Sequence, residues 1–487
     1  MGSLDLVPWE RLGPGDTVRI FFRPEPYRGK IFIAAQGTAN AIVRVCGVKG
    51  PMGERPVIAG RDASTRRGLN YGHPLHESRS IVLINRQGSE DWKAFPTNVK
   101  IDGLAISGAN PSNQFTDAAG HRHNYSEFGA CIWVERGHFV SIVDNEISDC
   151  TQAIFTKSTD EGDFALTREI RIVGNNFHNN GLAGSNKLHS TYVQSVGVIY
   201  EFNRYGPLRE GAKGNSIKDR SVGTVVRYNR IEDGARALDL VEAEDFPRAA
   251  RANPAYRATY VYGNQIIKDG RKGSAIHYGG DHNGSSPGAD WGEPNNRKGT
   301  LFFFHNTVRL TGDGYGVLFQ LSTTEESAEV WNNIFVFDPT IPTPRMRAGT
   351  EVGASWKAGG ILKLGRNWIS ENWRDTLYAS KLPQWLQGTE NLLRGLLSEK
   401  WRNSVKDKLA APLQGIENLT SGSRPPIDLA TLAPLPRSSA DLVPGPSSPS
   451  GAETHPVLYE LDTNFRPSLR KRTNRLIGLG ALEVKVD

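Results

Sequence analysis

An asparagine followed two residues later by an apolar or aromatic residue recurs through the middle of this chain of 487 residues. Its eight occurrences lie 26 to 42 residues apart, at Asn145, Asn175, Asn203, Asn229, Asn264, Asn306, Asn332 and Asn367. Self-similarity at a period of roughly 20 to 50 residues is the signature of a repeat protein, in which each repeat packs on its neighbours. This spacing constrains the fold more than any other feature of the sequence.

The segments between these asparagines predict strands rather than helices. Short β-branched and aromatic runs bounded by Gly, Asn and Asp recur, as in REIRIVGNNF, GTVVRYNRI and TLFFFHNTV. Asparagines stacked at equivalent turns can hydrogen-bond along the stack and satisfy backbone groups at the bend. The sequence therefore predicts an all-β fold, a single-stranded right-handed parallel β-helix, with loop insertions where the interval is long. The alternative is chance recurrence of common turn sequences, which eight occurrences matched to strands disfavour.

The predicted organisation has three parts. Residues 1–370 form the β-helix, with irregular early coils. Residues 371–412 carry apolar residues at helical spacing and are expected to form a helical insertion or cap, because the ends of a solenoid need covering. Residues 413–487 are rich in Pro and Ser at first and end in RLIGLGALEV, which predicts an irregular segment and a closing strand packed on the β-helix.

Composition excludes several classes of protein. No apolar run reaches the roughly 18 residues of a membrane span, and no signal peptide is visible at the start. The formal charge of +6 suits an anionic partner, but no nucleic-acid reader motif occurs, so we expect no nucleic acid. Cys46, Cys131 and Cys150 are an odd set without CxxC spacing, which argues against a disulfide scaffold or a zinc site.

Alternation along the predicted strands places a set of distinctive side chains on one outward face. Each follows an apolar residue that is expected to point inward; the set is Phe155, His189, Lys218, Asp239, His277 and Phe319. Lys157 and Arg220 lie two residues further along on the same face. Neighbouring strands are about 4.8 Å apart, so His189, Lys218 and Asp239 would reach one sugar. We therefore expect Lys218 and Arg220 to face a groove and not the core.

Each of these side chains also has a plainer interpretation as a surface charge, an ion-pair partner or a packing residue; this holds for Lys218, Arg220, Asp239, His189, His277, Tyr192 and Tyr278. Their coincidence on adjacent coils favours a binding site. The segments VEAED (241–245) and 277–299 add acids, aromatic residues and a loop.

The whole pattern resembles the pectin-lyase-like superfamily of right-handed parallel β-helix, carbohydrate-active proteins. The resemblance runs from GDTVRIFF to RLIGLGALEV and is strongest in HSTYVQSV, GNSIKDRSVGTVVRYNRIEDG and ATYVYGNQIIKDG. The segment around Lys218 is similar to the Lys-Ser strand of the alginate lyase and chondroitinase B group. That likeness implies a lysine base, an arginine on the following coil and a Ca²⁺ ion that neutralises the uronate carboxylate. Asp239 stands where the arginine is expected, which is a departure, and Arg220 is the candidate to replace it.

The resemblance implies a polysaccharide lyase that cleaves an anionic, uronic-acid-containing polysaccharide or oligosaccharide by β-elimination, in a secreted or periplasmic protein. Such a reaction needs a neutralised carboxylate and a base that reaches the neighbouring proton. We assign Lys218 as the base and Arg220 as the neutraliser, with His189 or Tyr192 protonating the leaving oxygen.

The remaining expected site residues bind substrate; they are Lys157, Asp239, Glu242, His277, Tyr278, His282, Trp291 and Lys213. Ca²⁺ is a possible cofactor, held by Asp239, Glu242 and Glu244. A glycoside hydrolase on the same fold also fits, since Asp239, Glu242, Glu244 and Asp245 supply carboxyl groups, although polygalacturonase signatures are missing. A uronate epimerase and a non-catalytic carbohydrate-binding β-helix protein are compatible with the same fold.

Overall fold

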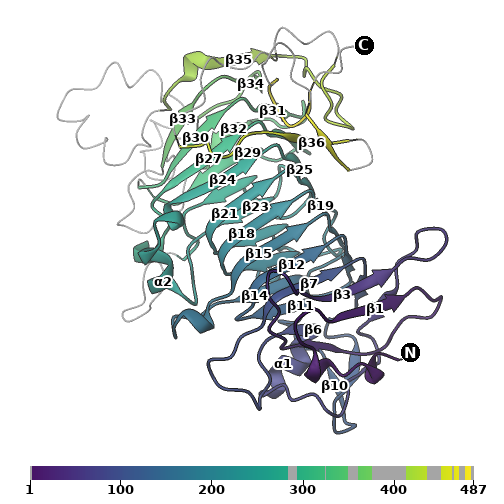
Figure 1. Cartoon of the computed structure of the whole chain (residues 1–487). Coiled ribbons are helices and arrows are strands. Elements are labelled where there is room, and N and C mark those ends of the chain that lie inside the picture. The colour runs from purple at the N-terminus through teal and green to yellow at the C-terminus, as the bar shows by residue number, and fades with distance from the viewer. Residues whose placement is uncertain are drawn as a thin grey trace. The chain divides into compact units, whose positions relative to one another are not determined.

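The computed structural model describes residues 3–282, 293–323, 325–348, 360–375, 413–435, 442, 451–462, 466–470 and 478–483. Parallel strands recur coil after coil in three sheets, which confirms the predicted parallel β-helix (Figure 1). The chain divides into two compact units, Met1–Ala235 with Ala243–Asn253, and Arg236–Glu242 with Pro254–Asp487. Each unit is described by itself.

In the first unit, each regular coil contributes one strand to each of three parallel sheets. Sheet 1 contains β1 (Thr17–Phe21), β3 (Val43–Val48), β7 (Thr97–Asp102), β12 (His138–Val143), β15 (Arg168–Val173), β18 (Val196–Glu201) and β21 (Val222–Arg227). Sheet 2 contains β2 (Ile31–Ile33), β6 (Ser80–Ile84), β11 (Ala130–Glu135), β14 (Gln152–Lys157), β17 (Thr191–Val193) and β20 (Ile217–Asp219). Sheet 3 contains β4 (Val57–Ala59), β8 (Ala105–Ser107), β13 (Glu146–Ser148), β16 (Asn176–His178), β19 (Arg204–Tyr205) and β22 (Arg230–Glu232).

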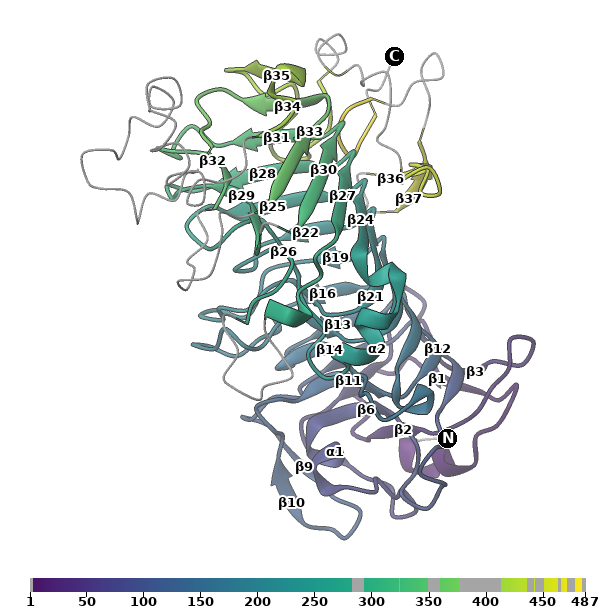
Figure 2. The same ribbon diagram turned by 90° about the vertical axis from the view of Figure 1, so that its left-hand side faces the viewer.

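Smaller elements decorate this unit. A three-stranded sheet is formed by β5 (Ala63–Ser64), β9 (Gln114–Thr116) and β10 (Arg122–Asn124). The two short helices are α1 (Pro74–Arg79) and α2 (Pro247–Ala252). Figure 2 shows β6, β11 and β14 of sheet 2 stacked one above another.

The second unit has the same construction. One parallel sheet contains β24 (Ala258–Tyr262), β27 (Thr300–Phe304), β30 (Ser327–Trp331) and β33 (Ile361–Leu364). Another contains β23 (Leu238–Leu240), β26 (Ile276–Tyr278), β29 (Val317–Leu321) and β32 (Arg345–Arg347). The third contains β25 (Gln265–Asp269), β28 (Thr307–Thr311), β31 (Ile334–Phe337), β34 (Asn367–Ser370) and β35 (Leu419–Gly422). A separate antiparallel pair is formed by β36 (Tyr459–Leu461) and β37 (Pro467–Leu469).

The core is built from inward side chains stacked in register. In sheet 1, Ile142 of β12 pairs with Ile172 of β15, which pairs with Tyr200 of β18. All three are fully buried. Because side chains alternate between the two faces of a strand, one apolar residue at every second position is enough to fill the interior.

The predicted asparagine stack is present in both units. Asn203 Oδ1 accepts the backbone N–H (2.9 Å) and the side-chain N–H (3.1 Å) of Asn175, and its own Nδ2 donates to Ile172 O (2.7 Å). The residue before it, Phe202, has φ +56°, so the chain turns sharply there. At one position of the stack in the second unit, between Asn306 and Asn367, the stacked residue is Asn333 and not the predicted Asn332. Asn332 occupies the left-handed turn position there, with φ +57°.

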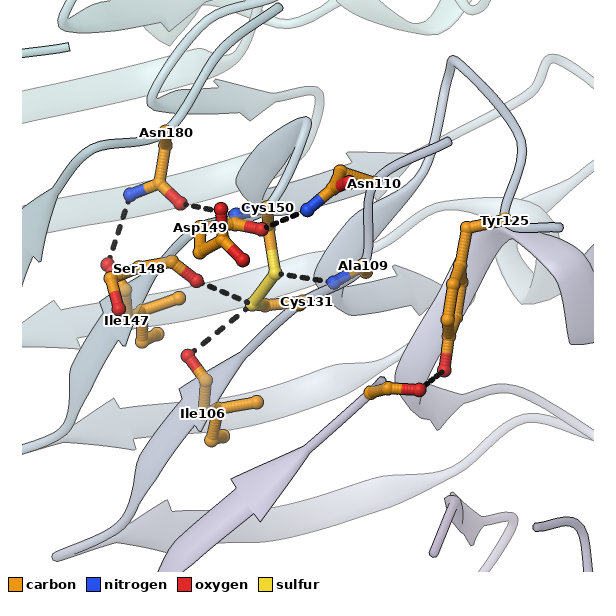
Figure 3. Close-up of a disulfide and its surroundings, with 12 residues drawn as sticks. Ile106, Ala109, Asn110, Tyr125, Cys131, Ile147, Ser148, Asp149, Cys150 and Asn180 are labelled. Atoms are coloured by element: carbon orange, nitrogen blue, oxygen red, sulfur yellow. Dashed lines mark hydrogen bonds between the residues drawn. A yellow bond between two sulfur atoms is a disulfide. The ribbon is translucent and has the colours of Figure 1, made fainter. Parts of the chain in front are cut away.

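Cys131 and Cys150 form a disulfide, although the odd number and the spacing of the cysteines argued against a disulfide scaffold (Figure 3). Cys131 lies in β11 and Cys150 lies just before β14, and their Cα atoms are 5.7 Å apart. Ala130 pairs with Gln152 across these neighbouring strands, so one turn of the solenoid brings the two cysteines together. Cys46 is a buried free thiol, as expected.

The described residues test the predictions for the C-terminal region only in part. Residues 376–412, which make up most of the expected helical insertion, lie outside the described residues. Residues 478–483 form bends where a closing strand was predicted. Gly480 has φ +80°, and Arg470 donates to the carbonyls of Gly478 and Gly480, so these carbonyls are not used in a ladder. Within the described part of the chain, no helix is long and apolar enough to cross a membrane.

Candidate functional site

The outward face of sheet 2 in the first unit carries a row of aromatic side chains that ends at a lysine. Trp133 pairs in register with Phe155, Phe155 with Tyr192, and Tyr192 with Lys218. The Trp133 and Phe155 rings lie 4.1 Å apart between centroids, and the Phe155 and Tyr192 rings lie 5.2 Å apart, edge to face. Such a row offers apolar surface of the kind that binding sites present.

The structure corrects the predicted column at one position in this unit. Tyr192 occupies the place assigned to His189, because β17 begins at Thr191 and Thr191, not Leu188, pairs with Ile154 and Ile217. His189 precedes the strand and packs edge to face against Tyr192, with ring centroids 5.7 Å apart. Its Nδ1 accepts the Asn215 backbone N–H at 2.9 Å, so the ring carries its proton on Nε2.

Tyr192 is the centre of a charged hydrogen-bond network. Its hydroxyl donates to Glu244 Oε2 at 2.6 Å and accepts from Arg220 Nε at 2.8 Å. Arg220 Nε also lies 3.2 Å from Glu244 Oε2. Burial raises the pKa of Tyr192 well above its usual value; Arg220 opposes this shift and Glu244 adds to it. The phenol therefore stays protonated at neutral pH and can serve as a proton donor.

The predicted open groove is wrong at Lys218 and Arg220, since each of these residues is only 3% exposed. Residues 243–246 account for part of this burial, because Glu244 binds Tyr192 and Arg220 there. Gln194 Nε2 donates to Asp245 Oδ2 at 2.7 Å, and the Asp245 N–H donates back to Gln194 Oε1 at 3.2 Å. Burial raises the pKa of Asp245, and Glu244 adds to that rise.

All four predicted catalytic residues thus gather at one place in the first unit; they are Lys218, Arg220, His189 and Tyr192. Glu244 and Asp245 belong to the same place; Glu244 was expected as a metal ligand and, together with Asp245, as a carboxyl group of the alternative hydrolase. Lys157 lies on the same face of β14 and lines a neighbouring cavity. Lys213 is exposed in the loop before β20.

In the second unit, Asp239 and His277 pair in register on neighbouring strands, as predicted. His277 Nδ1 lies 2.7 Å from Asp239 Oδ1 and its Nε2 lies 3.1 Å from Ser322 Oγ. Burial lowers the pKa of His277, and Arg236 lowers it further. Ser322 is 1% exposed and its oxygen already contacts the Gly280 N–H (2.8 Å) and carbonyl (2.6 Å). The trio therefore supports the turn after β26, and its serine is not placed as a nucleophile.

Two further predictions in this unit are wrong. Phe319 is fully buried and faces inward, and the outward residue beside His277 is Gln320. Both Leu318 and Phe319 are apolar and buried, so alternation in the sequence could not tell them apart. Tyr278 is buried in the row of Leu240 and Leu321, and is therefore a core residue instead of a substrate ligand. Trp291 lies outside the described residues.

The expected metal ligands do not gather as predicted. In the second unit, Glu242 forms a candidate metal cluster with Asp281 and His282. The ligand atoms of these three residues lie within 4.8 Å of one another. His282 Nδ1 lies 2.6 Å from Glu242 Oε1. A set containing an imidazole suits a transition metal better than Ca²⁺, which takes oxygen ligands. Asp239 is hydrogen-bonded to His277 and is not a member of this cluster.

No protein-family model and no curated protein matches this chain. Among solved structures, a mutant of the PL6 family alginate lyase AlyGC matches with 10% identity over 86% of this chain and 58% of its own, at a TM-score of 0.35. The DFA-IIIase of Arthrobacter chlorophenolicus in complex with GF2 matches with 13% identity over 74% and 84%, at a TM-score of 0.34.

The ORF18 protein of Geobacillus virus E2 matches with 10% identity over 72% of this chain, at a TM-score of 0.28. The chain spans about half, 52%, of the length of that protein. These likenesses concern the fold and identify no residue of the site.

Proposed function

We propose that this protein is a polysaccharide lyase that cleaves a uronic-acid-containing polysaccharide by β-elimination on the outward face of sheet 2 in the first unit. The observation that carries the proposal is the Tyr192 phenol, held between Arg220 and Glu244 and paired in register with Lys218. The aromatic side chains of Trp133 and Phe155 lead to it along the sheet.

In β-elimination, a base removes the C5 proton next to the uronate carboxylate, the electron pair forms the C4–C5 double bond, and the C4–O bond breaks. Lys218 is the base and Tyr192 gives its proton to the leaving oxygen. The raised pKa of Tyr192, caused first by burial, keeps that proton available at neutral pH. Arg220 lies beside the phenol and stabilises the phenolate that remains.

Arg220 also carries the positive charge that the substrate carboxylate needs. Its present anionic partner is Glu244, whose side chain is 37% exposed, whereas that of Arg220 is 4% exposed. A uronate carboxylate entering from the exposed side takes the place of Glu244 beside Arg220. The substrate therefore replaces a protein carboxylate and leaves no buried cation unpaired.

A glycoside hydrolase is the second candidate, favoured by one observation. Burial and the neighbouring Glu244 raise the pKa of Asp245, so one carboxyl group of this pair ionises less readily than usual and has a second carboxylate beside it. An acid and a second carboxylate are the groups that glycoside hydrolysis uses. Asp245 is also hydrogen-bonded to Gln194, which explains its placement without catalysis.

The test is the ultraviolet absorbance of an unsaturated uronate product across a panel of polyuronates, with and without chelator. The wild-type protein is compared with Lys218→Ala and Tyr192→Phe, and with Arg204→Gln, a matched charge change at an exposed position of β19. Loss of a general acid or base lowers the rate by about 10²- to 10⁴-fold. We expect that loss for Lys218→Ala and Tyr192→Phe and an unchanged rate for Arg204→Gln.

Other outcomes distinguish the competing functions. New reducing ends without absorbance would replace the lyase by the hydrolase and move the chemistry to Glu244 and Asp245. A changed ratio of uronate epimers without chain cleavage would indicate an epimerase, which shares the proton-abstraction step. Loss of activity with chelator would show a metal requirement, for which Ca²⁺ and transition-metal add-back are compared.

A further inference from the structure

A cavity of about 340 Å³ opens on the same outward face of sheet 2, next to the first strands of the aromatic row. Glu135 of β11 and Lys157 of β14 form its floor, and residues 71–92 supply much of its wall. Its volume lies at the lower end of the range of small-ligand sites, roughly 300 to 1,000 Å³. Every lining residue belongs to the first unit.

The lining of this cavity is strongly cationic. Arg79, Arg86, Arg136 and Lys157 face one carboxylate, Glu135, which leaves an excess of three positive charges before histidines are counted. Glu135 is itself occupied, because its Oε2 lies 3.1 Å from His76 Nε2 and its Oε1 lies 3.9 Å from Lys157 Nζ. Such a lining attracts an anion and disfavours a neutral ligand.

His76 bridges the backbone and Glu135 in this lining. Its Nδ1 lies 3.2 Å from the Tyr71 carbonyl oxygen and its Nε2 lies 3.1 Å from the Glu135 carboxylate.

Arg79 is the side chain that most clearly requires a ligand. Among the described residues its side chain has neither a hydrogen bond nor an ion pair, and its Nε is buried without a partner. The guanidinium lies over the Trp133 ring, 5.3 Å from the centroid, which places it at the start of the aromatic row. A buried donor left unpaired costs free energy, and a bound carboxylate accepts from a guanidinium in two places.

Trp92 gives the cavity a partly exposed aromatic wall. Its side chain is 53% exposed, and the guanidinium groups of Arg86 and Arg136 lie over its ring at 4.7 and 4.2 Å. Arg136 is fixed in place because its guanidinium donates to the Trp92 carbonyl.

We propose that this cavity binds a second anionic group of the saccharide chain, carried by a different sugar residue from the one that reacts. The inference rests on the proposed function, because it takes Tyr192 and Lys218 as the reacting end. The face of β14 at the cavity and the face of β20 at Arg220 are two strand spacings apart, about 10 Å. An extended oligosaccharide that lies along the aromatic row reaches both.

This arrangement defines the substrate class more closely. The chain must present negative charges on at least two sugar residues, so the protein acts on blocks of anionic sugars and binds short oligomers poorly. Carboxylate and sulfate groups share the required chemistry, and the test separates them.

Binding is measured by calorimetry in a Tyr192→Phe background, so that turnover does not remove the ligand. The probes are saturated pentasaccharides of mannuronate, guluronate and galacturonate, a sulfated glycosaminoglycan pentasaccharide, a neutral xylan pentasaccharide and a single-stranded oligonucleotide of the same charge. We expect one uronate or sulfated probe to bind, and Arg79→Gln to weaken it by about tenfold or more. Arg204→Gln, an equal loss of charge on β19, is expected to leave the affinity unchanged.

Equal affinity for the Arg79→Gln protein, tighter binding of the neutral saccharide, or tighter binding of the oligonucleotide would overturn the inference, as would no binding of any anionic saccharide. Calorimetry with the Tyr192→Phe protein does not depend on turnover. Failure of the lyase assay therefore leaves this result readable, and failure here leaves the assignment of Tyr192 intact.

Discussion

Replacement of Asn203 by alanine should destabilise the first unit strongly, although the side chain touches no candidate site residue directly. Asn203 Oδ1 accepts from Asn175 N and Nδ2, and Asn203 Nδ2 donates to the carbonyl of Ile172 and to Asn229 Oδ1. Alanine removes the acceptor of the buried Asn175 N–H and the side-chain donor of the Ile172 carbonyl. Each buried polar group left unpaired costs about 1–3 kcal/mol, so the pair costs about 2–6 kcal/mol.

The loss is measured by urea unfolding followed by circular dichroism, with Asn186→Ala as control. Asn186 is an exposed asparagine in the loop between β16 and β17, so its removal should cost less than about 0.5 kcal/mol. Repeat arrays can unfold in more than one step, so the midpoint of the affected transition is compared at unchanged slope. If Asn203→Ala and Asn186→Ala unfold with the same urea midpoint, the asparagine stack contributes no net stability, and its role is only to set the register of the coils.

Two other perturbations test the first unit. Replacing both Cys131 and Cys150 by alanine should cost about 3 kcal/mol in urea unfolding, because the bond closes a loop of 19 residues. This double variant should no longer respond to reductant, whereas the Cys46→Ala control keeps the response. Burial opposes ionisation of Glu135, but His76 and Lys157 outweigh it and lower the pKa of its carboxyl group to about 2. The ionised Glu135 therefore stabilises the folded protein at pH values above 4.5, its ordinary pKa. This stabilisation is lost as the pH falls from 4.5 towards 2. Glu135→Gln should flatten stability against pH in that window, and an unchanged acid limb would contradict the ion pair.

The fold could be predicted from the sequence because its main signal is local and repeated. A stacked asparagine needs the same turn in every coil, so its spacing reports the coil length directly. The position of a side chain on the outward face was harder to predict, because the strands of sheet 2 near the site are three residues long. Leu188 lies in the loop before β17 but is buried as a strand residue would be. It was therefore taken for an inward-facing strand residue, and the next residue, His189, was wrongly predicted to face outward.

The contacts that inserted loops make with the sheets could not be predicted from the repeat period of the sequence. Glu244 reaches Tyr192 across 52 residues of sequence, and Asp281 joins Glu242 across 39. Neither separation in sequence follows from the length of a coil, because both depend on how a loop folds over a sheet. The disulfide was different in kind: Cys131 and Cys150 lie less than one coil apart, and aligning Ala130 with Gln152 would have revealed it.

The site around Tyr192 and the cavity at Arg79 differ in how their charges are balanced, and this difference supports separate roles for them. At Tyr192, Arg220 lies 3.2 Å from Glu244, so the protein already contains a counter-charge there. At the cavity, four cations face Glu135 alone, and the Arg79 side chain lacks any hydrogen-bond partner among the described residues. An anionic saccharide gains most by binding first where positive charge is in excess. It can then displace Glu244 from Arg220 at the other end, where one carboxylate replaces another at little electrostatic cost.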